Sequence, residues 1–370
     1  MNRKILYGLY GLIFWFLIFL GWEWYKSHPK VRLDPISIPK TQAEKIDSIL
    51  IQSLSDFLIP GISVGIVQNG RVTYLNSFGF QNLASRDSMT IKSQIPVASV
   101  SKLFTALSTA NYFSETEISP STSLGEIFSK KNDLPTSLNS LSIAQLLSHK
   151  SGLRDSGPIE LILRRENQKK LDRILQQIDK PKFAADSFHY ADINYDLLGF
   201  ALQDHSKKPF EELVKETVLE KSGMSSSEFV TSWPQENNSM LGYAKTFLWK
   251  RIEPKPIQLE RFPSPSSGLV TTPENLAMAL VHLGRGPMGD FQKEMDWLKS
   301  GSDHPLGFQK IQIDGHNFIG HFGGQAGYSS IFLLSEELEI GFFILTNARD
   351  SYDHRKNIAS AILSTLISKP

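Results

Sequence analysis

A serine and a lysine three positions apart are the residues of this chain best placed to do chemistry. Ser99-Val-Ser-Lys102 opens a segment in which Leu103, Leu107 and Ala110 recur at helical spacing. Residues three apart lie on one face of a helix, so Lys102 can reach the Ser99 hydroxyl without tertiary help. A serine becomes nucleophilic beside a base, and a lysine with a lowered pKa can supply one. The pair predicts acyl transfer with Ser99 as nucleophile; the alternative is an ordinary helix start.

Other serines fit nucleophile patterns less well. Ser27-His-Pro-Lys30 and Ser37-Ile-Pro-Lys40 share the spacing, but each contains a proline in a linker, so nothing holds the two side chains together. Gly61-Ile-Ser63-Val-Gly65 matches the Gly-x-Ser-x-Gly elbow, which requires a strand before the serine and a helix after it. Here a proline precedes the motif, and the following residues have the pattern of a strand. The sequence therefore favours Ser99 over Ser63.

The N-terminus carries an apolar segment. Ile5 to Trp22 contains no charged residue, Arg3 and Lys4 precede it, and Trp24 follows it. At about 1.5 Å per helical residue, this segment is just long enough to cross a hydrocarbon core of about 30 Å. No Ala-x-Ala site follows, so we expect an uncleaved single-pass membrane anchor; a cleaved signal peptide and a buried helix of a soluble protein are the alternatives. The anchor and the signal both place the remaining chain outside the cytoplasm, in a periplasmic or extracellular space.

The rest of the chain divides by composition and periodicity. We expect an anchor over 1–26, a proline-containing linker over 27–40 and a hydrolase domain over 41–370. The pattern predicts a helix over 41–58, a hairpin over 62–75 with Asn69-Gly70 as its turn, a mostly helical region over about 98–260, strands over 327–334 and 340–346, and a helix over 357–367. The expected class is α/β: an antiparallel sheet built from both ends, flanked by the terminal helices, with the helical region inserted.

Composition narrows the function classes. Of 370 residues, 41% are hydrophobic and 21% charged, and the formal net charge is +1. Such a charge gives no overall field for nucleic acid, so we expect no nucleic-acid partner. Cysteine is absent, which excludes disulfides, thiolate catalysis and cysteine-ligated zinc. No His-Glu-x-x-His motif occurs, and we expect no metal and no organic cofactor.

Four later segments add to the serine–lysine pair. They are Leu146-Leu-Ser-His-Lys-Ser-Gly-Leu153, Tyr190-Ala-Asp192 with the following Ile-Asn-Tyr-Asp-Leu-Leu-Gly, Pro265-Ser-Ser-Gly-Leu-Val-Thr-Thr272, and Gly320-His-Phe-Gly-Gly-Gln-Ala-Gly-Tyr-Ser329. In this order the chain resembles the class C β-lactamases and their relatives: D,D-peptidases, D-aminopeptidases, carboxylesterases and LACTB-like proteins. The resemblance covers about residues 42–368. It implies the serine β-lactamase/D,D-peptidase-like fold, with the site where the sheet meets the helical region.

The resemblance also implies roles. Ser99 would attack the acyl carbonyl. Lys102 would lie between Ser99 and Tyr190, and Lys102 and Tyr190 would pass the proton from the serine to the leaving group. The backbone N–H groups of Ser99 and Gly324 would form the oxyanion hole. Gly323 would leave room for substrate along the strand edge. The His149 motif is a structural signature in relatives, so His149 is expected to belong to the scaffold.

Two departures from the family pattern bear on the substrate. Asp192 stands where relatives usually carry asparagine, and a carboxylate there would pair with Lys102 and favour the charged lysine. His321-Phe322-Gly323 stands where many relatives have Lys-Thr-Gly and others have His-x-Gly. Histidine is only partly charged near neutral pH, so a substrate carboxylate would bind less well. Both changes favour amide, peptide or ester hydrolysis over β-lactam hydrolysis.

The expected function is therefore a serine hydrolase that forms a Ser99 acyl-enzyme with a small-molecule or peptide substrate. The alternative is a catalytically weak or inactive protein of the same fold that serves as a binding or assembly module. The stretch from Glu236 to Phe262, which contains Trp249, is expected either to line the substrate site or to cover the core as a solvated loop. The sequence leaves the oligomeric state open.

Overall fold

The computed structural model describes residues 3–128, 134–156, 171–176, 178, 181–184, 186–233, 240–257, 259–260, 264–284, 289–299 and 304–367. The helices are α1 (Arg3–Lys26), α2 (Gln42–Asp56), α3 (Ser101–Ser114), α4 (Leu124–Ile127), α5 (Ile143–Leu147), α7 (Ile193–Ser206), α8 (Phe210–Val214), α9 (Pro273–Leu283), α10 (Gln292–Lys299) and α11 (His354–Ile367), with the short helical turns η1 (Ala98–Val100), η2 (Thr136–Leu138), η3 (Leu171–Gln176) and η4 (Lys215–Leu219). The strands are β1 (Gly61–Gln68), β2 (Arg71–Asn82), β3 (Asp87–Ser88), β4 (Ile95–Pro96), β5 (Glu228–Phe229), β6 (Ser232–Trp233), β7 (Tyr243–Lys245), β8 (Ile252–Pro254), β9 (Leu259–Glu260), β10 (Leu269–Thr271), β11 (Gln309–Ile313), β12 (His316–Gln325), β13 (Tyr328–Ser335) and β14 (Ile340–Thr346).

One antiparallel sheet joins the two ends of the domain. Its strand order is β11-β12-β13-β14-β1-β2-β3. The last strand of the chain, β14, pairs with the first, β1, so that Ile62 lies opposite Thr346 and Gln68 opposite Ile340. The prediction of a single sheet built from both termini is confirmed. The strand pair β11 and β12 was not among the predicted elements.

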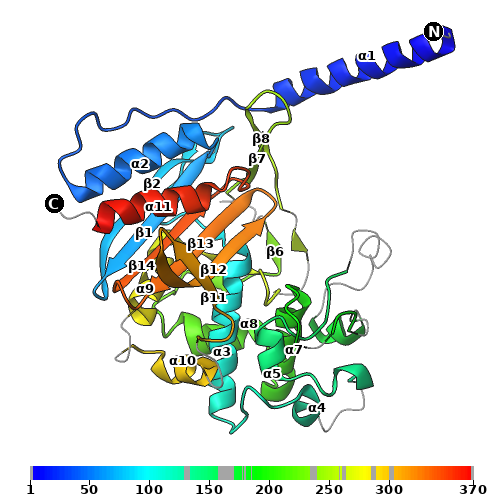
Figure 1. Cartoon of the computed structure of the whole chain (residues 1–370), viewed down its shortest axis with the longest axis vertical. Helices are drawn as coiled ribbons and strands as arrows, with labels where there is room; N and C mark the ends of the chain where they lie inside the picture. Colours follow the sequence, from blue (N-terminus) through cyan, green and yellow to red (C-terminus); the bar gives the residue numbers. More distant parts are fainter. Residues whose placement is uncertain are drawn as a thin grey trace.

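Both faces of this sheet are covered. Every residue of β14 is buried, because successive side chains point to opposite faces and each face meets apolar partners. Phe342 and Ile344 pack in one cluster with residues of α2 and α11, whereas Phe343 and Leu345 pack in the cluster formed with the helical region. Helices α2 and α11 lie side by side over one face (Figure 1). The α/β class with flanking terminal helices is confirmed.

Local sequence signals account for the ends of several elements. Thr41 caps α2: its side chain accepts from the backbone of Glu44, whose carboxylate accepts in return from the backbone of Thr41, a capping box. Asn69 and Gly70 both adopt positive φ in the tight turn between β1 and β2. The predicted helix over 41–58 and hairpin over 62–75 are confirmed, with boundaries that differ by a few residues.

The inserted region is helical but also carries short strands. Helices α7 and α8 pack against α3, and α4 and α5 pack against α7 (Figure 1). The short strands β5 to β9 lie in the same region, which the sequence predicted as helices and polar connections. The strands β7 and β8 are stabilised by a contact with a distant segment, because Tyr243 and Ile252 form a small buried cluster with Leu58. Such short pairs lack the length that makes a strand pattern readable in the sequence.

Helix α1 projects away from this body (Figure 1). It spans 24 residues, is long and apolar enough to cross a membrane, and only 6% of its most apolar stretch is buried. Its C-terminal end meets the β7–β8 hairpin.

Candidate active site

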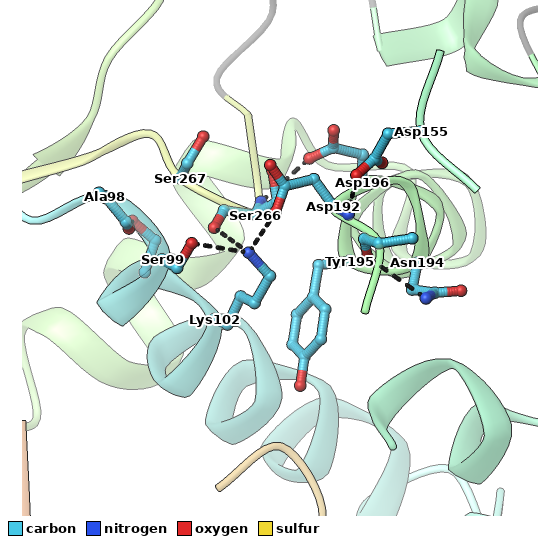
Figure 2. A network of polar contacts seen from close by, with 12 residues as sticks. Ala98, Ser99, Lys102, Asp155, Asp192, Asn194, Tyr195, Asp196, Ser266 and Ser267 are labelled. Atoms are coloured by element: carbon cyan, nitrogen blue, oxygen red, sulfur yellow. Dashed lines mark hydrogen bonds and ion pairs between the residues drawn. The ribbon is translucent and has the colours of Figure 1, made fainter. Parts of the chain in front are cut away.

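Ser99 and Lys102 meet at the start of α3. The Lys102 ammonium donates to the Ser99 hydroxyl over 3.2 Å (Figure 2). Ser99 lies in η1 and is half-buried, whereas the side chain of Lys102 is 0% exposed. The expected contact between the two side chains therefore exists, and it needs only the single helical turn that separates them.

Lys102 has two further partners. Its ammonium donates to the Asp192 carboxylate over 2.6 Å and to the backbone carbonyl of Ser266 over 2.9 Å (Figure 2). Burial lowers the pKa of Lys102, but the Asp192 carboxylate and the Tyr190 phenol raise it, and the net pKa lies above its usual value. The lysine of the resting site is therefore charged, as expected from the presence of an aspartate at position 192.

The segment around Pro265 fixes α3 in place. Ser101 accepts from the backbone N–H of Leu269, and Thr105 donates to the carbonyl of Pro265. A Cβ on Gly199 of α7 would overlap the Pro265 ring, so only glycine lets α7 approach this closely. The Pro265–Thr272 motif thus positions Lys102, a role that the sequence did not assign to it.

The residue before the nucleophile has an unusual backbone. Ala98 adopts φ of 49°, in the left-handed region that costs a non-glycine residue energy. The Ser101 hydroxyl donates to the Ala98 carbonyl over 2.6 Å and holds this turn. This turn precedes α3 and directs Ser99 toward β12. No pattern in the sequence predicts the positive φ of Ala98.

The edge of β12 passes beside Ser99. Strand β11 pairs with β12 only as far as Gly320, so in the described part of the chain no strand borders 321–325 on that side. A Cβ on Gly323 would overlap the Ser330 hydroxyl and the Val97 carbonyl and would lie 3.3 Å from the Ser99 nitrogen. A Cβ on Gly324 would meet no described atom within 4 Å. The strand is therefore closely packed against the turn that carries Ser99 at Gly323, whereas the side of Gly324 on which a Cβ would lie is open.

A cation from α11 holds this strand. Arg355 donates to the carbonyls of Gly323 and Ser330, and its guanidinium pairs with Asp350. The Ser330 hydroxyl donates to the Val97 carbonyl over 2.7 Å. These contacts fix β12 and β13 against the turn that carries Ser99.

Tyr190 lies over the lysine. The Lys102 nitrogen is 5.0 Å from the centroid of the Tyr190 ring, and the ring is 42% exposed. The ring of His149 packs against Tyr190 at a tilt of 30°, with 4.3 Å between centroids. His149 also lies beside the Asn194 amide, over 3.2 Å. The prediction that His149 belongs to the scaffold misses its direct contact with the candidate catalytic tyrosine.

The sequence led us to expect a partly charged His321, but in the structure its side chain is neutral. The residue is 2% exposed, and burial followed by the nearby charge of Lys102 lowers its pKa to about 3. Its Nδ1 lies 2.6 Å from the Phe322 carbonyl, a contact that a neutral ring makes by donating from Nδ1. His321 is therefore neutral near pH 7. The expectation that it supplies no strong cation is reinforced, for a reason that only burial could show.

Asp155 is a residue of this site that the sequence argument overlooked. Its carboxylate accepts from the backbone N–H groups of Asp192, over 3.0 Å, and Ile193, over 2.9 Å. Negative charge at the N-terminus of α7 is favourable, and the two bonds fix the backbone that carries Asp192. Burial raises the pKa of Asp155, although the two bonds oppose that shift. Its position shortly after Leu146–Leu153 was the available signal.

A cavity of about 840 Å³ opens beside the catalytic groups. Its lining includes His149 and His321, together with Leu306 and Phe308, but not Ser99, Lys102 or Tyr190, so the cavity adjoins these groups without reaching them. A cleft of this size accommodates a small molecule or a short peptide. Its lining includes no described residue of the stretch from 236 to 262, so Trp249 does not line it.

The structure thus brings together every residue that the sequence placed in the site. Ser99, Tyr190 and Asp192 surround the Lys102 ammonium group, and 321–324 forms the adjacent strand edge. The rival serine lies elsewhere: Ser63 is buried within β1, where its hydroxyl bonds to Ser77 over 2.7 Å.

Comparisons with known proteins agree with this geometry. Protein flp of Staphylococcus aureus is 22% identical over 324 residues, which are 84% of this chain and 64% of flp. The chain therefore spans less than two thirds of the length of that curated relative. A solved class C β-lactamase superposes with a TM-score of 0.74 at 19% identity, covering 93% of this chain and 100% of that one. The D-amino acid amidase of Ochrobactrum anthropi SV3, solved with D-phenylalanine, gives a TM-score of 0.70 at 18% identity, over 88% and 98% of the two chains.

These likenesses in structure show a shared fold, and the family follows from the sequence match. The model of the β-lactamase family matches residues 47–366, from α2 to α11. That range contains the whole sheet and every residue of the candidate site. The chain belongs to the β-lactamase family.

Proposed function

We propose that this protein is a serine hydrolase that transfers the acyl group of an amide, peptide or ester to water through an acyl-enzyme on Ser99. The observation that carries the proposal is the 3.2 Å contact between a fully buried Lys102 ammonium and the Ser99 hydroxyl. A buried lysine beside a half-exposed serine is placed to take the serine proton once it is neutral. The unbordered edge of β12 beside Ser99, and the cavity that His321 lines next to it, leave space for a substrate.

The reaction follows from the groups in place. Neutral Lys102 accepts the proton of Ser99, whose oxygen bonds to the acyl carbon. The carbonyl oxygen becomes negative and accepts from the backbone N–H groups of Ser99 and Gly324, each worth about 3 kcal/mol in such sites. The proton passes from Lys102, with Tyr190 beside it, to the leaving amine or alcohol as its bond to the acyl carbon breaks. Water then attacks the acyl carbon of the ester and gives a proton to Lys102, and Ser99 takes a proton back from Lys102 as its bond to the acyl carbon breaks and the acid is released.

Asp192 determines the charge of Lys102 before the reaction begins. Its carboxylate keeps Lys102 charged in the resting site, so a proton must leave the Lys102–Asp192 pair before Lys102 can act as a base. The Asp192 side chain is 45% exposed, so the pair is open to water that can carry this proton away. The pair therefore makes the rate of acylation depend on pH through the pKa of Lys102.

The proposed substrate class is an amide, peptide or ester without a carboxylate that must face position 321. His321 is buried and neutral, whereas many relatives carry a lysine there. A neutral imidazole offers a substrate carboxylate no ion pair. The structural likeness to an amidase solved with D-phenylalanine is compatible with a small amide substrate.

The test is intact-mass spectrometry of the full chain after incubation with a fluorophosphonate and, separately, with a penicillin. We expect one adduct with the fluorophosphonate and a slower or absent adduct with the penicillin. Ser99→Ala should remove the adduct, whereas the matched control Ser63→Ala should retain it. An adduct that survives in Ser99→Ala would overturn the assignment of the nucleophile.

A second candidate function rests on the same ion pair. If the Lys102–Asp192 pair never releases its proton, the protein binds acyl compounds in the cavity without turnover. In that case neither probe would give an adduct, while a D-amino acid amide would still raise the melting temperature of the protein by binding. Adduct formation at Ser99 excludes this candidate.

A further inference from the structure

The C-terminal end of α1 is bound to the β7–β8 hairpin by buried polar contacts. Glu23 is 2% exposed, and its carboxylate accepts from the backbone N–H groups of Phe247 and Leu248 at the hairpin tip. On the other side of the hairpin, Arg251 donates to the Ser27 hydroxyl over 2.8 Å and to the Ser27 carbonyl over 2.7 Å. A charged side chain is rarely buried unless it is paired in this way. The hairpin and α1 therefore form one built contact.

Aromatic side chains extend this contact into the apolar segment. The Trp249 indole donates to the carbonyl of Leu20 over 3.1 Å, and its ring meets Trp24 edge to face at 5.3 Å between centroids. The Arg251 guanidinium lies 4.1 Å from the centroid of the Trp24 ring. Leu20 belongs to the uncharged segment that ends at Trp22, so Trp249 bonds to α1 close to the end of that segment.

Apolar side chains at the hairpin tip remain uncovered. Phe247 is 73% exposed and Leu248 50% exposed, beside a helix whose apolar stretch is only 6% buried. Large exposed apolar side chains that gather at one end of a molecule indicate a surface that a membrane or another protein covers. Figure 1 shows the hairpin reaching toward the base of α1, so both surfaces face the same surroundings.

We propose that α1 is retained as a membrane anchor and that the tip of the β7–β8 hairpin enters the lipid–water interface beside it. Tryptophan and other amphipathic rings favour that interface, and Trp249 lies level with the end of the apolar run. Lys30 and Arg32 follow α1 in the chain and Lys250 lies at the hairpin tip, and basic side chains suit anionic lipid headgroups. At about 1.5 Å per residue, the 24 residues of α1 reach about 36 Å, enough to cross the bilayer.

This arrangement gives the domain two attachments to the membrane instead of one flexible tether. With the hairpin bound to the end of α1, the body of the protein is held at a defined angle to the bilayer. If α1 were cut away before Ser27, the backbone N–H groups of Phe247 and Leu248 would lose Glu23 as their acceptor. The Trp249 indole would lose the carbonyl of Leu20. The contact therefore distinguishes a retained anchor from a signal peptide that is cut away.

The first test uses single cysteines, because the chain contains none. The full chain carrying Phe247→Cys, labelled with an environment-sensitive fluorophore, is reconstituted in vesicles of phosphatidylcholine with phosphatidylglycerol. The matched control is Val72→Cys, an exposed apolar position (41%) on β2. We expect a blue-shifted emission at 247 that lipids with a nitroxide near the headgroup quench, and neither effect at 72. Emission at 247 that matches position 72 would overturn the proposal, as would a blue shift without quenching, which indicates a second copy of the chain as the partner.

Two further measurements address the anchor and its contact. Intact mass of the full chain extracted from membranes should correspond to retention of residues 5–22, and a mass that begins near Ser27 would overturn the proposal. Arg251→Ala with Trp249→Ala, in the Phe247→Cys protein, should lower the quenching at 247 because the hairpin loses its hold on α1. Unchanged quenching in that variant would overturn the role given to the contact between α1 and the hairpin.

Discussion

At the scale of the residue, the proposed reaction depends on the proton that Lys102 shares with Asp192. Lys102 is buried and bonded to Ser99, Asp192 and Ser266. The carboxylate is the nearest of the three and the one with a full negative charge. Relatives that carry an asparagine at this position lack that charge. Under the proposed mechanism, acylation of Ser99 therefore depends on the protonation of the Lys102–Asp192 ion pair.

The first prediction concerns that pair. Asp192→Asn removes the charge that raises the pKa of Lys102, so more of the lysine is neutral at a given pH. The rate of acylation by a fluorophosphonate should rise by about tenfold for each unit by which the lysine pKa falls. Stopped-flow or time-resolved mass measurements over a range of pH should show the rising limb of the profile at lower pH. A limb at the wild-type position would contradict the proposed role of Asp192.

Replacement of the lysine tests the base directly. Lys102→Met keeps most of the side-chain volume but cannot accept a proton, so acylation of Ser99 should be lost. The free energy of unfolding should stay close to that of the wild type, because Asp192 is half-exposed and water can replace its partner. Chemical denaturation checks the second expectation. Acylation that persists in a folded Lys102→Met protein would remove Lys102 from the mechanism.

The two adjacent glycines provide a further contrast at this scale. A Cβ at Gly323 overlaps the Ser330 hydroxyl and the Val97 carbonyl, whereas one at Gly324 meets open space. Gly323→Ala should therefore displace β12 from Ser99 and lower the acylation rate by roughly tenfold or more, since small displacements of reacting groups are costly. Gly324→Ala should react much faster than Gly323→Ala. Equal rates would show that the crowding at Gly323 does not position the site.

At the scale of the element, α11 supports a strand that it does not precede or follow directly in the chain. Arg355 joins α11 to the carbonyls of Gly323 and Ser330, and so to the strand edge that borders the nucleophile. The sequence around Arg355 predicts an amphipathic helix and nothing more. Its second role exists because β12, β13 and α11 meet at one end of the sheet.

The corresponding prediction is that Arg355→Met lowers both activity and stability. It leaves the Asp350 carboxylate, which is 7% exposed, without its guanidinium partner, and we expect a loss of roughly 3 kcal/mol in the free energy of unfolding. Acylation of the folded protein should also slow, because β12 loses its support. Lys356→Met is the matched control, since Lys356 is half-exposed and pairs with Asp353 over 3.9 Å. Equal effects of the two substitutions would contradict the role of Arg355.

At the scale of the whole molecule, buried histidines link stability to pH. Burial first, and then the charge of Lys102, lower the pKa of His149 to about 4 and that of His321 to about 3. In the unfolded chain both titrate near 6.5. Between these values the unfolded chain binds more protons than the folded protein, so the free energy of unfolding falls as the pH falls.

The prediction is quantitative for His149. Between about pH 7 and about pH 5 this residue alone should lower the free energy of unfolding by about 2 kcal/mol. Urea denaturation of the wild type and of His149→Gln should show a pH dependence that is smaller in the variant by that amount. His316→Gln, at the start of β12, serves as a control for loss of any histidine. A pH dependence that His149→Gln leaves unchanged would contradict the assignment.

Much of the fold was readable because it depends on periodicity and on local signals. The sheet strands at both ends alternate or run apolar, Thr41 and Asn69-Gly70 mark where elements begin and turn, and Ser99 and Lys102 need only one helical turn to meet. The ordered motifs after them then pointed to the family. The short strands β5 to β9 were missed, since two or three residues carry no periodic pattern.

The sequence by itself thus determined the sheet built from both ends, the helix that carries the nucleophile and the residues that gather around Lys102. The tertiary structure decided which of those groups are charged and what holds them. Burial makes His321 neutral, the approach of α7 brings Asp192 to 2.6 Å from Lys102, and Asp155 and Arg355 support the site from distant segments. Charge state and support depend on desolvation and on contacts between residues far apart in the chain, and neither leaves a local pattern in the sequence.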